Sequence, residues 1–169
     1  IVIDDFSTDN SKNVIKKYEN KKIFKLIFNK KNKGKGFCVR SGFDIATGDI
    51  CLIQDADLEY DPSEHVKVIK PILDGKADVV YGSRFSGYGV SKSVYRLHKF
   101  GNFIITSLCN LFTKLKLTDV ETCFKAFKAE KLKLITLKEN RFGFEPEITI
   151  KLAKKNCKIY EVGINYYGR

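Results

Sequence analysis

Short apolar segments alternate with longer segments of helical pattern over the first half of the chain. The apolar segments are residues 1–4, 23–28, 50–53 and 77–81, and a segment of helical periodicity separates each from the next. Strands that alternate with helices at this spacing pack as a mainly parallel sheet covered by helices. The sequence therefore predicts an α/β fold, in which functional side chains gather at the edge of the sheet where the strands end.

Two of these apolar segments end in paired carboxylates. Asp4 and Asp5 follow the first segment, and Asp55 and Asp57, separated by Ala56, follow the third. In an open α/β sheet, ligands bind outside the carboxyl ends of the strands. Proteins bind Mg²⁺ through one or two carboxylates together with waters and the oxygens of a substrate phosphate. The Asp-Ala-Asp segment therefore predicts a divalent-metal site, and a solvated acidic loop is the alternative interpretation.

The formal net charge of +11 suits an anionic partner: a nucleic acid, a sugar nucleotide, a phosphorylated substrate or a phospholipid surface. Charge alone does not choose between these partners. The five cysteines are scattered and form no Cys-x-x-Cys pair, which indicates reduced, structural thiols in a cytosolic protein. Only two histidines are present and neither lies near a cysteine, so we do not expect a zinc site.

The length of 169 residues suits one domain. The chain begins inside the first apolar segment without an initiator methionine, so we expect a strand–helix unit to precede residue 1. No apolar stretch approaches the length of a membrane span. Residues 92–117 have a helical pattern with an apolar body and basic ends. A core helix explains this pattern, and so does a helix that lies on an anionic membrane surface.

The second half of the chain predicts further elements. Residues 123–128 alternate phenylalanine and lysine, which predicts a strand with one face in water. Residues 142–155 predict a helix whose first turn carries Glu145 and Glu147, where acids suit the positive helix end. Residues 158–167 predict a last strand.

Taken in order, the motifs resemble the inverting family-2 glycosyltransferases of the GT-A fold, and above all their dolichol-phosphate mannosyltransferase and polyprenyl-phosphate glycosyltransferase group. Each motif alone is weak, but the ordered set is specific. The matching stretches are residues 3–9, 32–36, 46–49, 55–62, 82–84, 96–102, 119–125, 144–147 and 166–169.

This chain departs from the family pattern at several positions. Phe6 and Glu59 stand where the family usually has Gly and Gln, and Cys123-Phe124-Lys125 stands for Gly-Phe-Arg. The family's first strand, with its Pro-x-Tyr-Asn-Glu-like segment that helps to hold the nucleotide, is absent. We therefore interpret residues 1–169 as a single glycosyltransferase catalytic domain that is truncated at its N-terminus.

The resemblance implies a three-layer α/β/α, Rossmann-like fold with a mainly parallel central sheet. It implies an inverting, Mg²⁺- or Mn²⁺-dependent transfer of mannose or glucose from GDP-mannose or UDP-glucose to a polyprenyl phosphate, either dolichyl or undecaprenyl. The protein is then expected to be cytoplasmic and peripherally associated with a membrane surface. A nucleic acid is not an expected partner.

On the donor side, a divalent cation offsets the charge that develops on the leaving nucleoside diphosphate. We assign Asp57 as the principal metal ligand, with Asp55 and Glu59 as further ligands or holders of bound water. By resemblance, Asp4 and Asp5 contact the base or the ribose, and their alternative role is turn and cap chemistry. A lysine between two glycines, Lys35, is a candidate to approach a phosphate, and a solvated lysine explains it equally well.

On the acceptor side, a lipid phosphate is already an anion, so it needs alignment and charge compensation rather than a general base. Arginine matches phosphate with two parallel N–H donors, and the candidates are Arg84, Arg96 and Arg169. Asp119 is expected to orient these arginines or Lys125, or else to cap a turn. The expected catalytic residues are Asp57, Arg84 and Arg96. The expected substrate-binding residues are Asp4, Asp5, Lys35, Asp55, Ala56, Glu59, Arg84, Asp119 and Arg169.

Four alternatives remain open. Two alternatives keep the family: an enzyme that acts on another glycan acceptor, and a truncated, inactive fragment. A sugar nucleotidyltransferase also sets acids at strand ends, but it usually has a Gly-rich activating loop near its N-terminus. A basic nucleic-acid-binding module would show strong, salt-dependent DNA binding. The acids on the expected ligand edge argue against that module.

Overall fold

The computed structural model describes residues 1–86 and 96–168, and for residues 96–98 only the backbone. By its internal contacts the chain divides into two compact units. The first unit comprises residues 1–47 and 137–144, and the second comprises the rest of the described chain. Whether the chain acts as a single catalytic domain stays a prediction.

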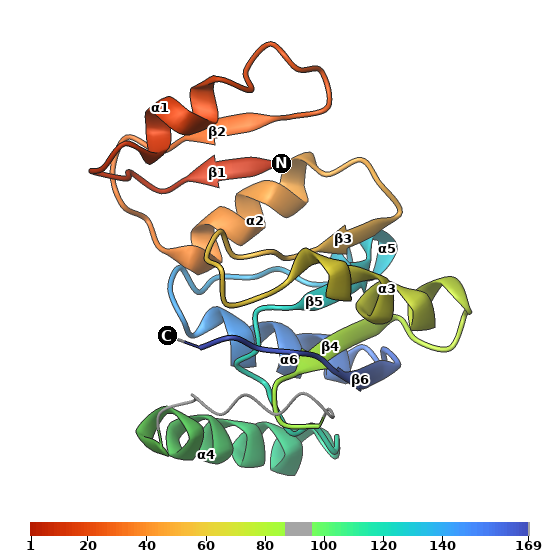
Figure 1. Ribbon diagram of the computed structural model, residues 1–169. Helices are drawn as coiled ribbons and strands as arrows, with labels where there is room; N and C mark the ends of the chain where they lie inside the picture. Colours follow the sequence, from red (N-terminus) through yellow and green to blue (C-terminus); the bar gives the residue numbers. More distant parts are fainter. Residues whose placement is uncertain (87–95, 169) are drawn as a thin grey trace. The chain divides into compact units, whose positions relative to one another are not determined.

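The first unit is built on a parallel pair of strands, β1 (Val2–Asp4) and β2 (Leu26–Phe28). The helix α1 (Ser11–Lys16) connects them, and α2 (Lys35–Ile45) follows β2 (Figure 1). The predicted alternation of strand and helix is therefore present from the first residues. The acids Asp4 and Asp5 lie where β1 ends.

The second unit contains a four-stranded sheet in the order β3-β5-β4-β6. The strand β5 pairs antiparallel with both β3 and β4, whereas β4 and β6 are parallel (Figure 1). Hence β3, β4 and β6 run in one direction and β5 alone runs against them, which agrees with the predicted mainly parallel sheet. The bounds are β3 Ile50–Leu52, β4 Val79–Ser83, β5 Lys125–Lys128 and β6 Ile159–Gly163.

Helices pack on both faces of this sheet because each presents an apolar stripe to it. In α3, Val68 and Ile72 are buried, and in α6, Ile148 and Leu152 are fully buried. All five residues of β4 are buried, as expected for a central strand covered on both faces. The helices of this unit are η1 Pro62–Glu64, α3 His65–Leu73, α4 Arg96–Thr113, α5 Ala129–Leu132 and α6 Phe144–Lys154, of which only Phe144 is assigned to the first unit.

The strand β5 corrects one expectation, because the face predicted to be wet is buried. Lys125 is fully buried, and its Nζ lies 2.5 Å from Oε2 of Glu145 on α6. The same ammonium donates to the carbonyl oxygen of Thr122 and lies 4.9 Å from the centroid of the Tyr81 ring. A charged group can be buried when it is paired and hydrogen-bonded in this way. The alternating pattern indicates that the lysines share one face of the strand. It does not show whether that face contacts water or a carboxylate of the covering helix.

We predict that Lys125→Met lowers the free energy of unfolding by about 3 kcal/mol, because it removes the cation that forms an ion pair with the buried carboxylate of Glu145. The matched control is Lys128→Met on the same strand, where the lysine is 30% exposed and pairs with Asp78 at 2.9 Å. A partly exposed pair contributes less, so the control should lose clearly less stability than Lys125→Met. Urea denaturation measures both, and equal losses would contradict the assigned role of Lys125.

Candidate active site

The loop after β3 carries the predicted metal ligands. Asp55, Ala56 and Asp57 line a surface depression of about 450 Å³, and the two carboxylates are partly buried. Within the part of the chain that the structure describes, no three carboxylate, histidine or cysteine side chains form a ready-made metal site. The remaining lining residues of the depression are Gln54, Leu58, Tyr60, Asp61, Pro62 and Tyr167.

Hydrogen bonds fix the shape of this acidic loop. The backbone N–H of Asp55 donates to Sγ of Cys123 at 3.1 Å, and the N–H of Glu59 donates to Oδ1 of Asp57 at 3.2 Å. Mg²⁺ and similar ions need only one or two protein carboxylates when waters and phosphate oxygens complete the shell. The donor set of Asp55 and Asp57 therefore fits a divalent ion that is held jointly with a diphosphate.

Glu59 takes a different position from the two aspartates. Its Oε2 accepts a hydrogen bond of 2.8 Å from the hydroxyl of Tyr166, and its carbonyl oxygen accepts one of 2.9 Å from the N–H of Tyr167. Sequence reasoning missed Tyr166, which lies 107 residues further along the chain. The family match at residues 166–169 was its only signal.

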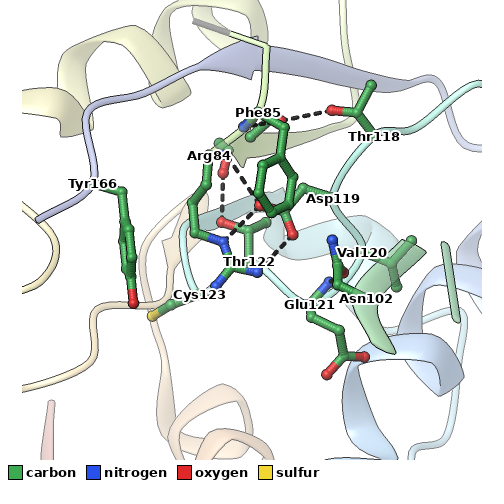
Figure 2. Close-up of polar contacts among 12 residues, drawn as sticks. Arg84, Phe85, Asn102, Thr118, Asp119, Val120, Glu121, Thr122, Cys123 and Tyr166 are labelled. Atoms are coloured by element: carbon green, nitrogen blue, oxygen red, sulfur yellow. Dashed lines mark hydrogen bonds and ion pairs between the residues drawn. The ribbon is translucent and has the colours of Figure 1, made fainter. Parts of the chain in front are cut away.

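Arg84 and Asp119, both predicted site residues, are brought together by the structure (Figure 2). Arg84 directly follows β4, and its Nε and Nη2 donate to the two oxygens of Asp119 at 2.7 and 2.8 Å. The backbone N–H of Arg84 adds a third bond of 3.0 Å. Burial opposes the charged guanidinium, but Asp119 outweighs it and raises the pKa of Arg84. Asp119 thus orients Arg84, whereas Lys125 pairs with Glu145.

The turn that contains Asp119 is itself attached to the sheet. The carboxylate of Glu161 on β6 accepts the backbone N–H groups of Thr118 and Asp119, at 2.9 and 3.0 Å. The hydroxyl of Thr122 donates to the carbonyl oxygen of Gly82 on β4. Since these contacts come from two strands, the position of Asp119 is set by the sheet.

Two buried polar atoms beside this turn have no hydrogen-bond partner among the described residues: Oε1 of Glu121 and Nδ2 of Asn102. Figure 2 shows the two side chains next to each other, and the N–H of Glu121 donates to Oδ1 of Asn102 at 3.2 Å. Burial, helped by the charge of Glu145, raises the pKa of Glu121. The sequence offered no signal for this pair, because Glu121 stands in a polar turn.

In the first unit, the two acids after β1 have local partners. Oδ2 of Asp4 accepts the N–H of Ser7 at 3.3 Å, which is turn chemistry. Asp5 accepts the N–H groups of Lys33 and Gly34, at 2.9 and 2.7 Å, and the side-chain amide of Asn29 at 2.7 Å. Burial acts in the opposite direction, but these hydrogen bonds lower the pKa of Asp5. Asp5 therefore holds the loop that precedes α2.

Lys35 is the first residue of α2 and lies between two buried glycines. A Cβ at Gly34 would lie 2.5 Å from the carbonyl oxygen of Asn140, and one at Gly36 would collide with that of Glu139. Gly34 also has a φ of +94°, which side chains disfavour. Close packing against residues 139–140 therefore explains both glycines without a phosphate.

Two of the predicted arginines cannot be placed in the site. Arg96 begins α4, but its side chain lies outside the described residues, and so does the whole of Arg169. Of the other site residues, Asp4, Asp5 and Lys35 belong to the first unit. Asp55, Ala56, Asp57, Glu59, Arg84 and Asp119 belong to the second.

Residues 1–136 match the model of the family described as Glycosyl transferase family 2. The chain belongs to this family. It is 27% identical over 170 residues to the low-salt glycan biosynthesis hexosyltransferase Agl6 of Haloferax volcanii, covering 100% of this chain and 40% of that protein. It is 29% identical over 168 residues to the dolichol-phosphate mannosyltransferase of Pyrococcus furiosus, covering 98% of this chain and 47% of that protein. The family-2 chain thus spans less than half the length of these two relatives.

The fold is similar to that of a solved enzyme, glucosyl-3-phosphoglycerate synthase from Mycobacterium tuberculosis in complex with Mn²⁺, UDP and phosphoglyceric acid. The TM-score is 0.76 at 17% sequence identity, over 99% of this chain and 59% of that one. This likeness confirms the predicted GT-A fold of the family-2 chain.

Proposed function

We propose that this family-2 chain is the catalytic part of an inverting glycosyltransferase that moves mannose or glucose from a nucleoside-diphosphate sugar to a polyprenyl phosphate, with a divalent metal. The observation that carries the proposal is the guanidinium of Arg84, which Asp119 fixes in the same unit as Asp55 and Asp57. This unit thus offers an oriented cation for a phosphate and a carboxylate pair for a metal. The dolichol-phosphate relative supports the lipid acceptor.

On the donor side, a bound Mg²⁺ or Mn²⁺ would compensate the charge of the leaving diphosphate. Asp57 and Asp55 would hold it, and the N–H of Glu59 keeps Asp57 oriented. Asp4 and Lys35 are our candidates for contacts to the nucleotide. Asp5 contributes by holding the loop at Lys33 and Gly34, since those N–H groups already occupy its oxygens.

On the acceptor side, Arg84 would align the phosphate of the lipid. A guanidinium has five N–H donors, and Asp119 takes two of the Arg84 donors through Nε and Nη2. The remaining donors serve a phosphate, which as an anion attacks the sugar carbon without a general base. Because the guanidinium is oriented before the acceptor binds, little reorganisation is needed. We propose the same kind of contact for Arg96 and Arg169.

The donor half is tested with Asp57→Asn in the full-length protein. We predict that wild type binds UDP-glucose or GDP-mannose in a Mn²⁺-dependent manner, and that the variant binds at least about tenfold more weakly, because it loses the principal metal ligand. Isothermal titration with Mn²⁺, and with EDTA in its place, measures this.

The matched control is Asp61→Asn. Asp61 lines the same depression and its side chain caps η1 by accepting the N–H of Ser63, a role that asparagine can keep. This variant should bind nearly as wild type. An equal loss of affinity in both variants would show that the loss comes from the change in net charge and not from a metal ligand. Binding without any metal would also overturn the assignment of Asp57.

The acceptor half is tested with Arg84→Lys. We predict a rise of at least about tenfold in the KM for dolichyl or undecaprenyl phosphate with donor binding unchanged, because lysine cannot make the forked contact. Transfer of labelled sugar measures it. The control is Arg40→Lys on α2, an arginine bonded to the backbone of Glu139. Transfer to a glycan but to no lipid phosphate would contradict the acceptor, and transfer of a nucleotide would favour a nucleotidyltransferase.

We also propose that the protein is cytoplasmic and binds a membrane surface peripherally through α4. Residues 85–118 contain five lysines and arginines and no acid. Side chains along α4 are 50–73% exposed although they are apolar: Phe100, Phe103, Leu108, Leu111 and Phe112. Basic ends beside an exposed apolar face suit an anionic bilayer. Within the described part of the chain, every helix is too short or too polar to span a bilayer.

We predict that Phe103→Glu combined with Leu111→Glu weakens binding to vesicles of phosphatidylcholine and phosphatidylglycerol by at least about tenfold. In the wild type, each of these apolar side chains moves from water into the bilayer on binding, and this transfer favours binding. Flotation measures binding, with pure phosphatidylcholine vesicles alongside. The control is Leu73→Glu on α3, a leucine that is 72% exposed. Unchanged binding of the double variant would contradict the proposed surface.

A further inference from the structure

Tyr166 belongs to a short segment that is hydrogen-bonded to the acidic loop. It pairs with Tyr60 in an isolated antiparallel bridge, and the next residue, Tyr167, donates its N–H to the carbonyl oxygen of Glu59 at 2.9 Å. The segment follows β6, whereas the loop follows β3. The backbone therefore brings Tyr166 to the loop from the opposite end of the second unit's sequence.

The Tyr166 side chain makes two further contacts. Its hydroxyl donates to Oε2 of Glu59 at 2.8 Å, and the centroid of its ring lies 5.4 Å from Cζ of Arg84. Figure 2 shows Tyr166 and Asp119 on opposite sides of the Arg84 side chain. Tyr60, which is buried, packs edge-on against the Tyr166 ring, with the two ring centroids 5.1 Å apart. The phenol thus touches both the acidic loop and the arginine.

We propose that Tyr166 is a positioning residue that joins Glu59 of the acidic loop to Arg84, so that the metal side and the phosphate side of the site keep one common geometry. This inference rests on the proposed function for the meaning of the two sides. The hydrogen bond to Glu59 and the ring contact with Arg84 are present in the structure whatever the function.

The chain of contacts leads from Tyr166 to the expected metal ligand. The hydroxyl fixes the Glu59 carboxylate, the Tyr167 N–H fixes the Glu59 carbonyl, and the Glu59 N–H donates to Asp57 Oδ1 at 3.2 Å. Partners that orient a ligating side chain strongly affect metal affinity. Removing the hydroxyl should therefore loosen Asp57.

The second contact restrains Arg84. Asp119 holds the guanidinium by its edge through Nε and Nη2, while the Tyr166 ring lies near Cζ. A ring near a guanidinium attracts it and limits its motion. Burial, and then Glu59, raise the pKa of the Tyr166 phenol to about 12, so at neutral pH the hydroxyl remains a donor. Glu59 acts on the hydroxyl more strongly than Arg84 does, whereas the ring lies near the guanidinium of Arg84. Removing the hydroxyl alone, or the ring with it, therefore separates the two main contacts.

Tyr166→Phe in the full-length protein removes only the hydroxyl. We expect Mn²⁺ binding, measured in the presence of UDP or GDP by the paramagnetic signal of the free ion, to weaken by about tenfold. The KM for dolichyl phosphate should stay within about twofold, since the ring is kept. Tyr166→Leu removes the ring as well, and should in addition raise that KM at least about threefold.

The matched control is Tyr160→Phe, which deletes a hydroxyl from a tyrosine on β6 that is 48% exposed. It should change neither quantity. Unchanged Mn²⁺ affinity in Tyr166→Phe would overturn the proposal, and so would equal changes of both quantities together with a lowered melting temperature, since that pattern is a purely structural loss. Because Mn²⁺ binding is measured without sugar or lipid, this result stands apart from the outcome of the transfer assays.

Discussion

The buried carboxylate of Asp119 fixes the arrangement around the end of β4. It is fully buried and accepts three N–H groups of Arg84, one from the backbone and two from the guanidinium. A buried carboxylate is costly without a cation beside it. Loss of either Arg84 or the Asp119 carboxylate would therefore leave an uncompensated charge in the interior. Glu161 holds the same turn from β6 by accepting the N–H of Asp119. The arginine is therefore oriented by the fold before any ligand arrives.

The local charges of this region differ from those of the whole chain. The protein carries a net charge of +11, yet the buried carboxylates of Asp119 and Glu145 are matched one to one with Arg84 and Lys125. Glu121 adds a third carboxylate, and its raised pKa follows from burial and from the charge of Glu145. The excess of lysine therefore says little about the site. What matters there is which cations are held in place and by which acids.

Sequence patterns predicted the features that depend on neighbours along the chain. The alternation of strands and helices, the acids after β1 and β3, and Arg84 after β4 all follow from local periodicity and strand ends. Contacts between distant residues did not follow. Lys125 reads as a surface lysine until Glu145, 20 residues away, is placed against it. The glycines that flank Lys35, the candidate to approach a phosphate, pack closely against the backbone of residues 139–140, which lie about a hundred residues away in the sequence. Periodicity carries no information about such partners.

Glu59 adds a negative charge to the acidic loop at a position where the resemblance leads one to expect glutamine. Among the described residues, Asp55 and Asp57 line the depression and Glu59 does not. Its carboxylate instead accepts the Tyr166 hydroxyl, and a hydrogen bond to the charged form stabilises that form. Glutamine offers one oxygen acceptor for the same hydroxyl, but no charge. A charged acceptor generally makes a stronger hydrogen bond than a neutral amide oxygen, so glutamate holds the Tyr166 hydroxyl more firmly than glutamine would. The side chain of the third acid of the loop therefore holds the segment at Tyr166, and its backbone N–H holds Asp57. Its role as a further metal ligand stays a prediction.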